Sequence, residues 1–299
     1  MVNPLDHISP QLACDLCGAD TSLNSVRVAG GRQDLCGLVV DLSTVVCRRC
    51  RFVFQLEAFS DALLAALYRS DTSFNLNDIE DHQARSRAHL AERQAVISTA
   101  LARHGIADGS TILDVGGGRG ECCQHLAEQH RVVVADVAEC LPADSRIEKI
   151  PGLFSASVAP DTFDVVVMNH ILEHVFSPTR FLESAHRVLR AGGILIVEVP
   201  FELYTPLVAR HLGDWRHVAY FCRTTLTRFL EKSGFEVDRV VLAEGCYGVR
   251  RLPVIRATAC KAATSPARGP IRSSALVLAM DMLAPTVLVP LAKNRLMRR

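Results

Sequence analysis

Residues 111–121, with the sequence TILDVGGGRGE, are the feature that most constrains the fold of this chain. Residues 111–115 form a mostly apolar, partly β-branched run, which predicts a buried strand. Glycines follow at Gly116, Gly117, Gly118 and Gly120, and residues 121–129 have the composition of a helix. A strand that runs through a glycine-rich turn into a helix lets a ligand lie against bare backbone. Nicotinamide and flavin enzymes use a similar turn, so the turn alone does not define the ligand.

Two acidic residues flank this turn. Asp114 lies at the end of the first predicted strand, before the glycines. Asp136 ends a second predicted strand, residues 131–135 (RVVVA), and stands twenty positions beyond Gly116. A carboxylate at that place has two oxygens that can accept hydrogen bonds from both ribose hydroxyls of an adenosine. The spacing of the glycines is G-x-G-x-G, whereas dinucleotide-binding proteins use G-x-G-x-x-G.

The motif ILDVGGGRGE, followed by Asp136, resembles the first motif of the class I S-adenosylmethionine (SAM) dependent methyltransferases. The resemblance implies that Gly116 and Gly118 allow close approach of the methionine part of SAM and that Asp136 binds its ribose. A dehydrogenase or a non-catalytic Rossmann domain is the alternative. A backbone carbonyl near Leu153 or Phe154 is expected to accept a hydrogen bond from the adenine amino group. Asn169 is expected to hold the methionine end of the cofactor. The other expected cofactor contacts are Asp114 and His170, the latter facing either SAM or the core.

Two later segments support the same resemblance. Residues 165–168 predict a buried strand beside the first, and its carboxyl end carries NHILEHV, residues 169–175. Ligands of open α/β sheets bind beyond the carboxyl ends of the strands. The segment resembles the LEH motif of these methyltransferases, and residues 186–200 (HRVLRAGGILIVEVP) resemble a frequent signature of the family. The expected fold is α/β, a Rossmann-like seven-stranded SAM methyltransferase fold with a small N-terminal zinc ribbon.

The zinc ribbon is predicted from two C-x-x-C pairs, Cys14 with Cys17 and Cys47 with Cys50. Two thiolates at this spacing bind one side of a tetrahedral ion, and a second pair completes four-coordinate Zn²⁺. Such a closed site has no open position, so the zinc is expected to be structural. Cys36 is a possible substitute ligand, and four unrelated buried cysteines are the alternative.

The expected organisation has four parts. Residues 1–59 form the zinc ribbon, 60–108 a helical connector or lid, and 109–262 the methyltransferase domain. Residues 263–299 form a linker and an apolar, basic tail. The tail predicts either peripheral membrane contact or packing on protein, including a homodimer, and we favour packing on protein.

Charge argues against nucleic acid as a partner. The formal net charge of the chain is +1. Residues 1–60 carry five arginines against six acidic residues, a net charge of −1. An RNA-binding module should be basic and expose aromatic residues. The chain starts without a basic region followed by an apolar core, which predicts a cytoplasmic protein without a signal peptide.

Residues 200–222 are the expected substrate-recognition segment, because they mix aromatic and hydrogen-bonding side chains, which suits a sugar. A base must remove the proton when the methyl acceptor is a hydroxyl, and histidine suits this task. His174 is the first candidate and His217 the second.

The predicted function is therefore SAM-dependent methylation of a small molecule, most directly a sugar hydroxyl. The main alternative is C-methylation of a nucleotide-linked deoxysugar, in which Tyr220, His217 or Glu202 handles the proton. RNA methylation and a non-catalytic SAM-binding scaffold are further alternatives. Some sugar O-methyltransferases use Mg²⁺, but no acidic cluster in this sequence indicates it.

Overall fold

The structure is a computed structural model, and it describes residues 7–35, 37–70, 80–138, 140–152, 158–203, 212–247 and 250–262. Within these ranges no helix is long and apolar enough to cross a membrane. The tail 263–299, with its predicted membrane or protein contacts, lies outside the described residues, as does Cys36.

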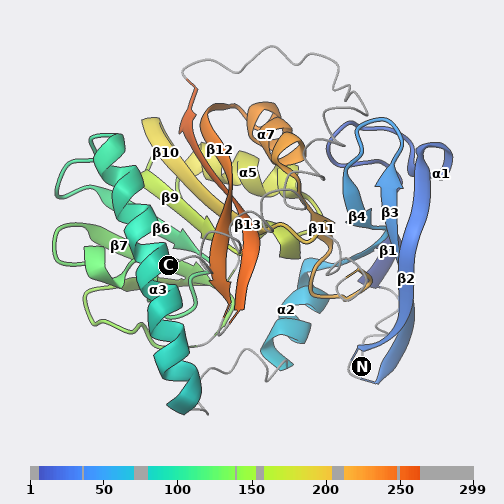
Figure 1. Ribbon diagram of the computed structural model, residues 1–299, viewed down its shortest axis with the longest axis horizontal. Helices are drawn as coiled ribbons and strands as arrows, with labels where there is room; N and C mark the ends of the chain where they lie inside the picture. Colours follow the sequence, from blue (N-terminus) through green and yellow to red (C-terminus); the bar gives the residue numbers. More distant parts are fainter. Residues whose placement is uncertain are drawn as a thin grey trace, which may run out of the picture.

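The centre of the molecule is a seven-stranded sheet with the order β12-β13-β10-β9-β6-β7-β8 (Figure 1). Strands β10, β9, β6, β7 and β8 pair in parallel, and β13 and β12 add an antiparallel hairpin at the β10 edge. This confirms the expected Rossmann-like sheet. The strands are β6 (Thr111–Val115), β7 (Arg131–Asp136), β8 (Glu148–Pro151), β9 (Phe163–Asn169), β10 (Leu189–Pro200), β12 (Phe235–Tyr247) and β13 (Arg250–Lys261).

Apolar side chains cover both faces of this sheet because successive residues of a strand point to opposite sides. Val132 and Val134 of β7 belong to one buried cluster, together with Ile97 of helix α3 (Glu80–Arg103). Val133 points to the opposite face of the sheet and belongs to a second buried cluster, which includes residues of α5 (Pro178–Val188) and α7 (Arg223–Lys232). The near-continuous apolar runs of β7 and β9 are therefore those of strands buried on both faces.

The connections place a topological switch point, where α/β sheets form their ligand crevice, at the carboxyl end of β6. The chain leaves β6 toward β7 and β8, and then returns to the opposite side of β6 to form β9. In open α/β sheets, ligands bind at such a switch point, beyond the carboxyl ends of the strands. The glycine turn after β6 and the segment NHILEHV after β9 both lie there.

The N-terminal part forms a four-stranded sheet with the order β11-β4-β3-β2. Strands β2, β3 and β4 come from the predicted ribbon, but β11 comes from residues 219–220, far along the chain. A second, two-stranded sheet pairs β1 with β5. The elements are β1 (Ile8–Pro10), α1 (Thr21–Asn24), β2 (Ser25–Leu35), β3 (Leu38–Cys47), β4 (Val53–Gln55), β5 (Glu57–Phe59), α2 (Asp61–Ser70) and β11 (Ala219–Tyr220).

The helix predicted over residues 121–129 is wrong. The structure has consecutive turns there, with one short 3₁₀ helix, η3 (Gln124–Leu126). The backbone bonds close at three residues, from Cys123 N–H to Gly120 C=O and from Leu126 N–H to Cys123 C=O. The segment starts from Gly120 in the left-handed region and then carries two cysteines and a histidine, which are weaker helix formers than its Glu, Gln, Leu and Ala.

Candidate functional site

The glycine turn after β6 is shaped to bring a ligand against the backbone. Gly116 and Gly118 have φ values of +65° and +57°, a region that side chains disfavour. A Cβ on Gly116 would lie 1.9 Å from Cδ1 of Ile171, so the turn packs closely against the segment that follows β9. Glycine at position 116 is therefore required by the packing of Ile171, and the predicted approach of the cofactor to Gly116 and Gly118 stays a prediction.

Asp136, the predicted ribose ligand, is held rigidly at the end of β7. One carboxylate oxygen accepts a hydrogen bond from Gly118 N–H at 2.7 Å, and the other accepts one from Ala138 N–H at 2.7 Å. Each oxygen retains a second lone pair. The carboxylate thus ties the glycine turn to β7, and its contact with ribose stays a prediction.

Asp114 lies beneath the turn rather than on its outer side. Its side chain is 1% exposed, and a Cβ on Gly117 would lie 2.4 Å from its carboxyl group. Burial raises the pKa of Asp114 to about 7. The carboxyl group therefore packs against the inner side of the glycine turn. Its expected contact with the cofactor stays a prediction.

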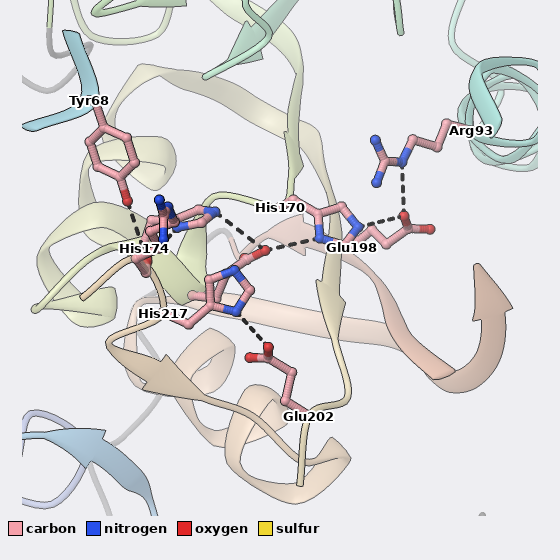
Figure 2. A network of polar contacts seen from close by, with 9 residues as sticks. Tyr68, Arg93, His170, His174, Glu198, Glu202 and His217 are labelled. Carbon is pink, nitrogen blue, oxygen red and sulfur yellow. Dashed lines mark hydrogen bonds and ion pairs between the residues drawn. The ribbon is translucent and has the colours of Figure 1, made fainter. Parts of the chain in front are cut away.

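The end of β9 leads into a buried ionic network (Figure 2). His170 has a φ of +54°, and its Nδ1 lies 3.0 Å from Glu173 Oε1 while its Nε2 lies 3.0 Å from Glu198 Oε1. Glu198 of β10 also accepts hydrogen bonds from Arg93 of α3 and Arg256 of β13. His170 thus bridges two carboxylates. Asn169, the last residue of β9, stands beside Glu198 in the sheet register.

The charges of this network stabilise its two carboxylates. Burial alone would raise the pKa of Glu173, but His170 and His174 outweigh it and hold that pKa low. The pKa of Glu198 is held low by His170, Arg93 and Arg256, again against the effect of burial. Both groups are therefore carboxylates over the ordinary pH range.

His174 and His217 face each other at the same edge, with ring centroids 4.8 Å apart and planes at 82°. His174 lies in the short 3₁₀ helix η4 (Leu172–His174), and its Nδ1 lies 2.6 Å from the carbonyl oxygen of Arg216. A carbonyl only accepts, so Nδ1 carries the proton and the neutral ring has its lone pair on Nε2. Burial lowers the pKa of His174, which favours this neutral form.

His217 is oriented by a carboxylate. Its Nδ1 lies 2.6 Å from Glu202 Oε1, and Glu202 and His174 lie on opposite sides of its ring (Figure 2). Burial works against the charged ring, but the hydrogen bond to Glu202 and the charges of Glu202 and Glu173 outweigh it and raise the pKa of His217. A buried carboxylate that fixes one nitrogen of a histidine and stabilises its cation is the arrangement of a general base.

The four predicted zinc ligands meet in the ribbon. Cys14 Sγ lies 3.5 Å from Cys50 Sγ, Cys17 Sγ lies 3.6 Å from Cys47 Sγ, and all four sulfurs lie within 4.8 Å of one another. Tetrahedral Zn²⁺ with bonds of about 2.3 Å separates its sulfurs by about 3.8 Å. The residues therefore fit the ion. Four unrelated cysteines would not converge in this way, and zinc itself stays a proposal.

A family model described as a methyltransferase domain matches residues 81–240, more than half of the chain. The chain belongs to this methyltransferase family. The match spans the glycine turn, the end of β9 and both histidines, so the crevice described above lies inside the family domain.

Curated relatives agree with this assignment. A probable SAM-dependent methyltransferase of Mycolicibacterium smegmatis is 30% identical to this methyltransferase over 138 residues, which cover 44% of the chain and 53% of that protein. The chain thus spans about half the length of that relative. The ubiquinone/menaquinone biosynthesis C-methyltransferase UbiE of Escherichia fergusonii is 27% identical over 188 residues, covering 49% of the chain and 75% of UbiE.

Among solved structures, the methyltransferase is similar to the 1,6-didemethyltoxoflavin-N1-methyltransferase of Burkholderia thailandensis. The TM-score is 0.53 at 19% identity, and the match covers 80% of this chain and 99% of that one. The likeness concerns the fold. That crystal structure contains 1,6-didemethyltoxoflavin and S-adenosylhomocysteine.

Tyr220, the third predicted catalytic residue, lies in β11, which contacts the helix η4 that carries His174. The side chain of Tyr220 is 1% exposed and packs in the main core, and its strand β11 pairs with β4 of the ribbon. Burial raises the pKa of Tyr220, and Glu202 raises it further. A buried phenol with a raised pKa stays protonated, and the predicted part of Tyr220 in C-methylation stays a prediction.

Some residues of the methyltransferase crevice were not predicted, and others cannot be placed. Arg93, Glu198 and Arg256 were missed, and the signal for Glu198 is an acidic residue inside the apolar run ILIVEVP. Leu153 and Phe154, the expected adenine contacts, lie outside the described residues.

Proposed function

We propose that this methyltransferase transfers the methyl group of SAM to a small-molecule acceptor, most directly a sugar hydroxyl. The observation that carries the proposal is the pair of partly buried histidines at the carboxyl edge of the sheet, each held through Nδ1. Bound SAM would supply a methyl group already activated for in-line displacement. The protein then has to align the acceptor and take up its proton.

His217 is the proposed base, and His174 lies beside it. With Nδ1–H donated to Glu202, a neutral His217 has its lone pair on Nε2, and Glu202 stabilises the cation that forms when it accepts a proton. His174 presents a second Nε2 lone pair at the same place and helps to orient the acceptor hydroxyl. The order of the two candidates is therefore the reverse of that predicted from the sequence.

A small, partly apolar acceptor suits the surroundings of these rings. The ring of Tyr68 lies 5.8 Å from that of His174 and 5.4 Å from that of Trp215. The guanidinium of Arg216 lies 5.0 Å from the centre of the Trp215 ring. Aromatic faces beside charged and hydrogen-bonding groups are suited to a sugar, whose apolar faces stack while its hydroxyls need partners.

C-methylation is the second candidate, and the name of UbiE as a C-methyltransferase favours it. The same base would then remove a proton from carbon instead of oxygen. The two products differ in chemical stability and in the carbon–proton correlations of the new methyl group, so NMR of the product decides between them.

We further propose that the four cysteines hold structural Zn²⁺, and that the protein acts in the cytoplasm. Reduced cysteines in two C-x-x-C pairs are typical of metal-binding proteins of a reducing compartment. The ribbon is acidic on balance, which does not favour RNA as the acceptor.

The first test is calorimetric titration with S-adenosylhomocysteine, alongside Asp136→Ala. We expect micromolar binding by the wild-type protein and at least tenfold weaker binding by the variant. The second test screens sugar and nucleotide-sugar acceptors with labelled SAM, comparing His217→Ala with His125→Ala, whose exposed ring lies beside Ser98 of α3. Turnover should fall at least 100-fold in His217→Ala alone. Well-folded protein that binds no S-adenosylhomocysteine would overturn the proposal.

A further inference from the structure

Glu173, His174 and His217 bring three potential metal ligands together at the carboxyl edge of the sheet. One ligand atom of each residue lies within 4.8 Å of those of the other two. We propose that these three residues form a second metal site, separate from the four cysteines, which binds a divalent transition-metal ion.

Both histidines are oriented as metal ligands usually are. A ligating histidine donates its second ring N–H to a carboxylate or a backbone carbonyl, which fixes the tautomer and the plane of the ring. His174 makes this bond to the carbonyl oxygen of Arg216 and His217 makes it to Glu202, each at 2.6 Å. The nitrogen that each residue offers to an ion is therefore Nε2.

Glu173 supplies an independent observation that points to a bound cation. Its side chain is 1% exposed, and Oε1 lies 3.0 Å from His170 Nδ1 and 3.8 Å from His174 Nε2. Its other oxygen, Oε2, is buried and has no hydrogen-bond partner among the described residues. A buried carboxylate oxygen without a partner is costly, and a bound cation would remove that cost.

The backbone holds the three residues in place. Glu173 and His174 are consecutive in η4, and Val218 N–H donates to the carbonyl of Glu173 at 2.8 Å. This bond links the residue after His217 directly to the segment that carries the other two ligands. The site is thus assembled from two chain segments that the fold has already joined.

The donor set selects the class of ion. Two imidazoles and one carboxylate favour Zn²⁺, Co²⁺ or Ni²⁺ over Mg²⁺ and Ca²⁺, which prefer oxygen ligands alone. Ligands at about 2.0–2.1 Å from a tetrahedral ion are about 3.3 Å apart. The ligand atoms must therefore move closer together by up to about 1.5 Å on binding, and a tetrahedral ion retains one coordination position for water.

A bound ion would compete with proton uptake, and this consequence rests on the proposed function. The Nε2 lone pairs that would receive the acceptor proton are the ones that would bind the metal. Excess transition metal should therefore inhibit methyl transfer, whereas a chelator too weak to remove the cysteine-bound zinc should restore it.

Cobalt titration of zinc-loaded protein tests the site without any assay of turnover. We expect one further equivalent of Co²⁺ to bind, with the visible spectrum of nitrogen and oxygen ligands and without the thiolate charge-transfer band that the cysteine site would give. His217→Ala and the conservative Glu173→Gln should weaken this binding at least tenfold, and Glu202→Gln by about tenfold or more through the orientation of His217. His125→Ala should leave it unchanged.

The outcomes separate this proposal from the proposed function. Wild-type protein that binds no second equivalent, or only a thiolate-type spectrum, overturns the metal site, as does a spectrum unchanged in both His217→Ala and Glu173→Gln. Circular dichroism of each variant ensures that lost binding does not reflect lost folding. Cobalt binding by protein that neither binds S-adenosylhomocysteine nor methylates an acceptor would retain the site and overturn the function.

Discussion

At the scale of single residues, the buried carboxyl of Asp114 makes stability depend on pH. Its pKa rises from 3.8 to about 7 on folding because of burial. A carboxyl whose pKa is raised in the folded state contributes stability that is fully present below pH 3.8 and is lost as the pH rises through 7. The shift of about three units corresponds to about 4 kcal/mol.

We therefore expect Asp114→Asn to remove this dependence. Between pH 4.5 and pH 8, the melting temperature of the wild-type protein should fall relative to that of the variant, and the variant should be the more stable above pH 7. Differential scanning fluorimetry of both proteins across this range measures the difference, in which the other titrating groups cancel. A difference that does not change with pH would contradict the buried, proton-binding state of Asp114.

Arg51 is a second residue at which a substitution should change stability, because of its backbone conformation. It follows the second cysteine pair and has a φ of +68°, the value that Gly18 has after the first pair. A side chain in this region costs about 1–2 kcal/mol, whereas glycine costs about 0.5–1 kcal/mol of chain entropy. Arg51→Gly should stabilise the ribbon by about 0.5 kcal/mol. Arg48 does not have a positive φ, so Arg48→Gly adds only the entropic cost of glycine. Arg48→Gly should therefore destabilise the ribbon in the same thermal unfolding measurement.

These residues show what spacing in the sequence can and cannot predict. The glycine turn and the cysteine pairs were found because their backbone and ligand geometry is set within a few positions of the chain. Glu198 was missed because its partners Arg93 and Arg256 come from an N-terminal helix and from the last strand of the sheet. Such a network is fixed by the topology of the sheet, which no local pattern contains.

At the scale of elements, the ribbon caps a helix of the methyltransferase domain. Asp15 lies between the first two cysteines, and its carboxylate accepts hydrogen bonds from Ser177 Oγ at 2.9 Å and from Thr179 N–H at 2.8 Å. Its backbone carbonyl also accepts a hydrogen bond from Lys232 Nζ of α7. Carboxylates at a helix N-terminus satisfy its unpaired N–H groups and favourably meet its dipole.

Asp15→Ala should accordingly loosen the start of α5 and the adjoining segment of η4. We expect a loss of about 1–2 kcal/mol in stability and faster hydrogen exchange over residues 172–182. Asp34→Ala is the matched control, because its carboxylate accepts a hydrogen bond from Gly37 N–H within the ribbon hairpin. Equal exchange in residues 172–182 of both variants would show that Asp15 does not couple the two parts.

The elements themselves were mostly predictable, and the exceptions have physical reasons. Apolar runs identified the strands at residues 111–115, 131–135 and 165–168, which lie in β6, β7 and β9, since most of their stability comes from burial that the pattern displays. The prediction of a helix over residues 121–129 was wrong because two cysteines and a histidine, which are weaker helix formers, stand among the Glu, Gln, Leu and Ala residues. Strand β11 was missed because two residues give no pattern, and its pairing with β4 arises only in the folded chain.

At the scale of the whole molecule, the ribbon and the methyltransferase domain share one hydrophobic core. Phe52 follows the second cysteine pair, and its ring lies 5.8 Å from that of Phe221 and 4.8 Å from that of Phe229 in α7. The same buried cluster contains Cys14, Cys47 and Cys50. A change at the metal ligands is therefore transmitted to the packing of the sheet.

Removal of zinc should for this reason destabilise the entire protein in one step. The metal contributes to folding only when its four thiolates converge, and the core around them extends into the domain. A strong chelator should lower the melting temperature by roughly 10 °C in a single calorimetric transition. It should also weaken binding of S-adenosylhomocysteine, and added Zn²⁺ should reverse both effects. Cys17→Ser should reproduce the loss without chelator. Two separate transitions, with the upper one insensitive to zinc, would mean that the shared core does not couple the ribbon to the methyltransferase domain.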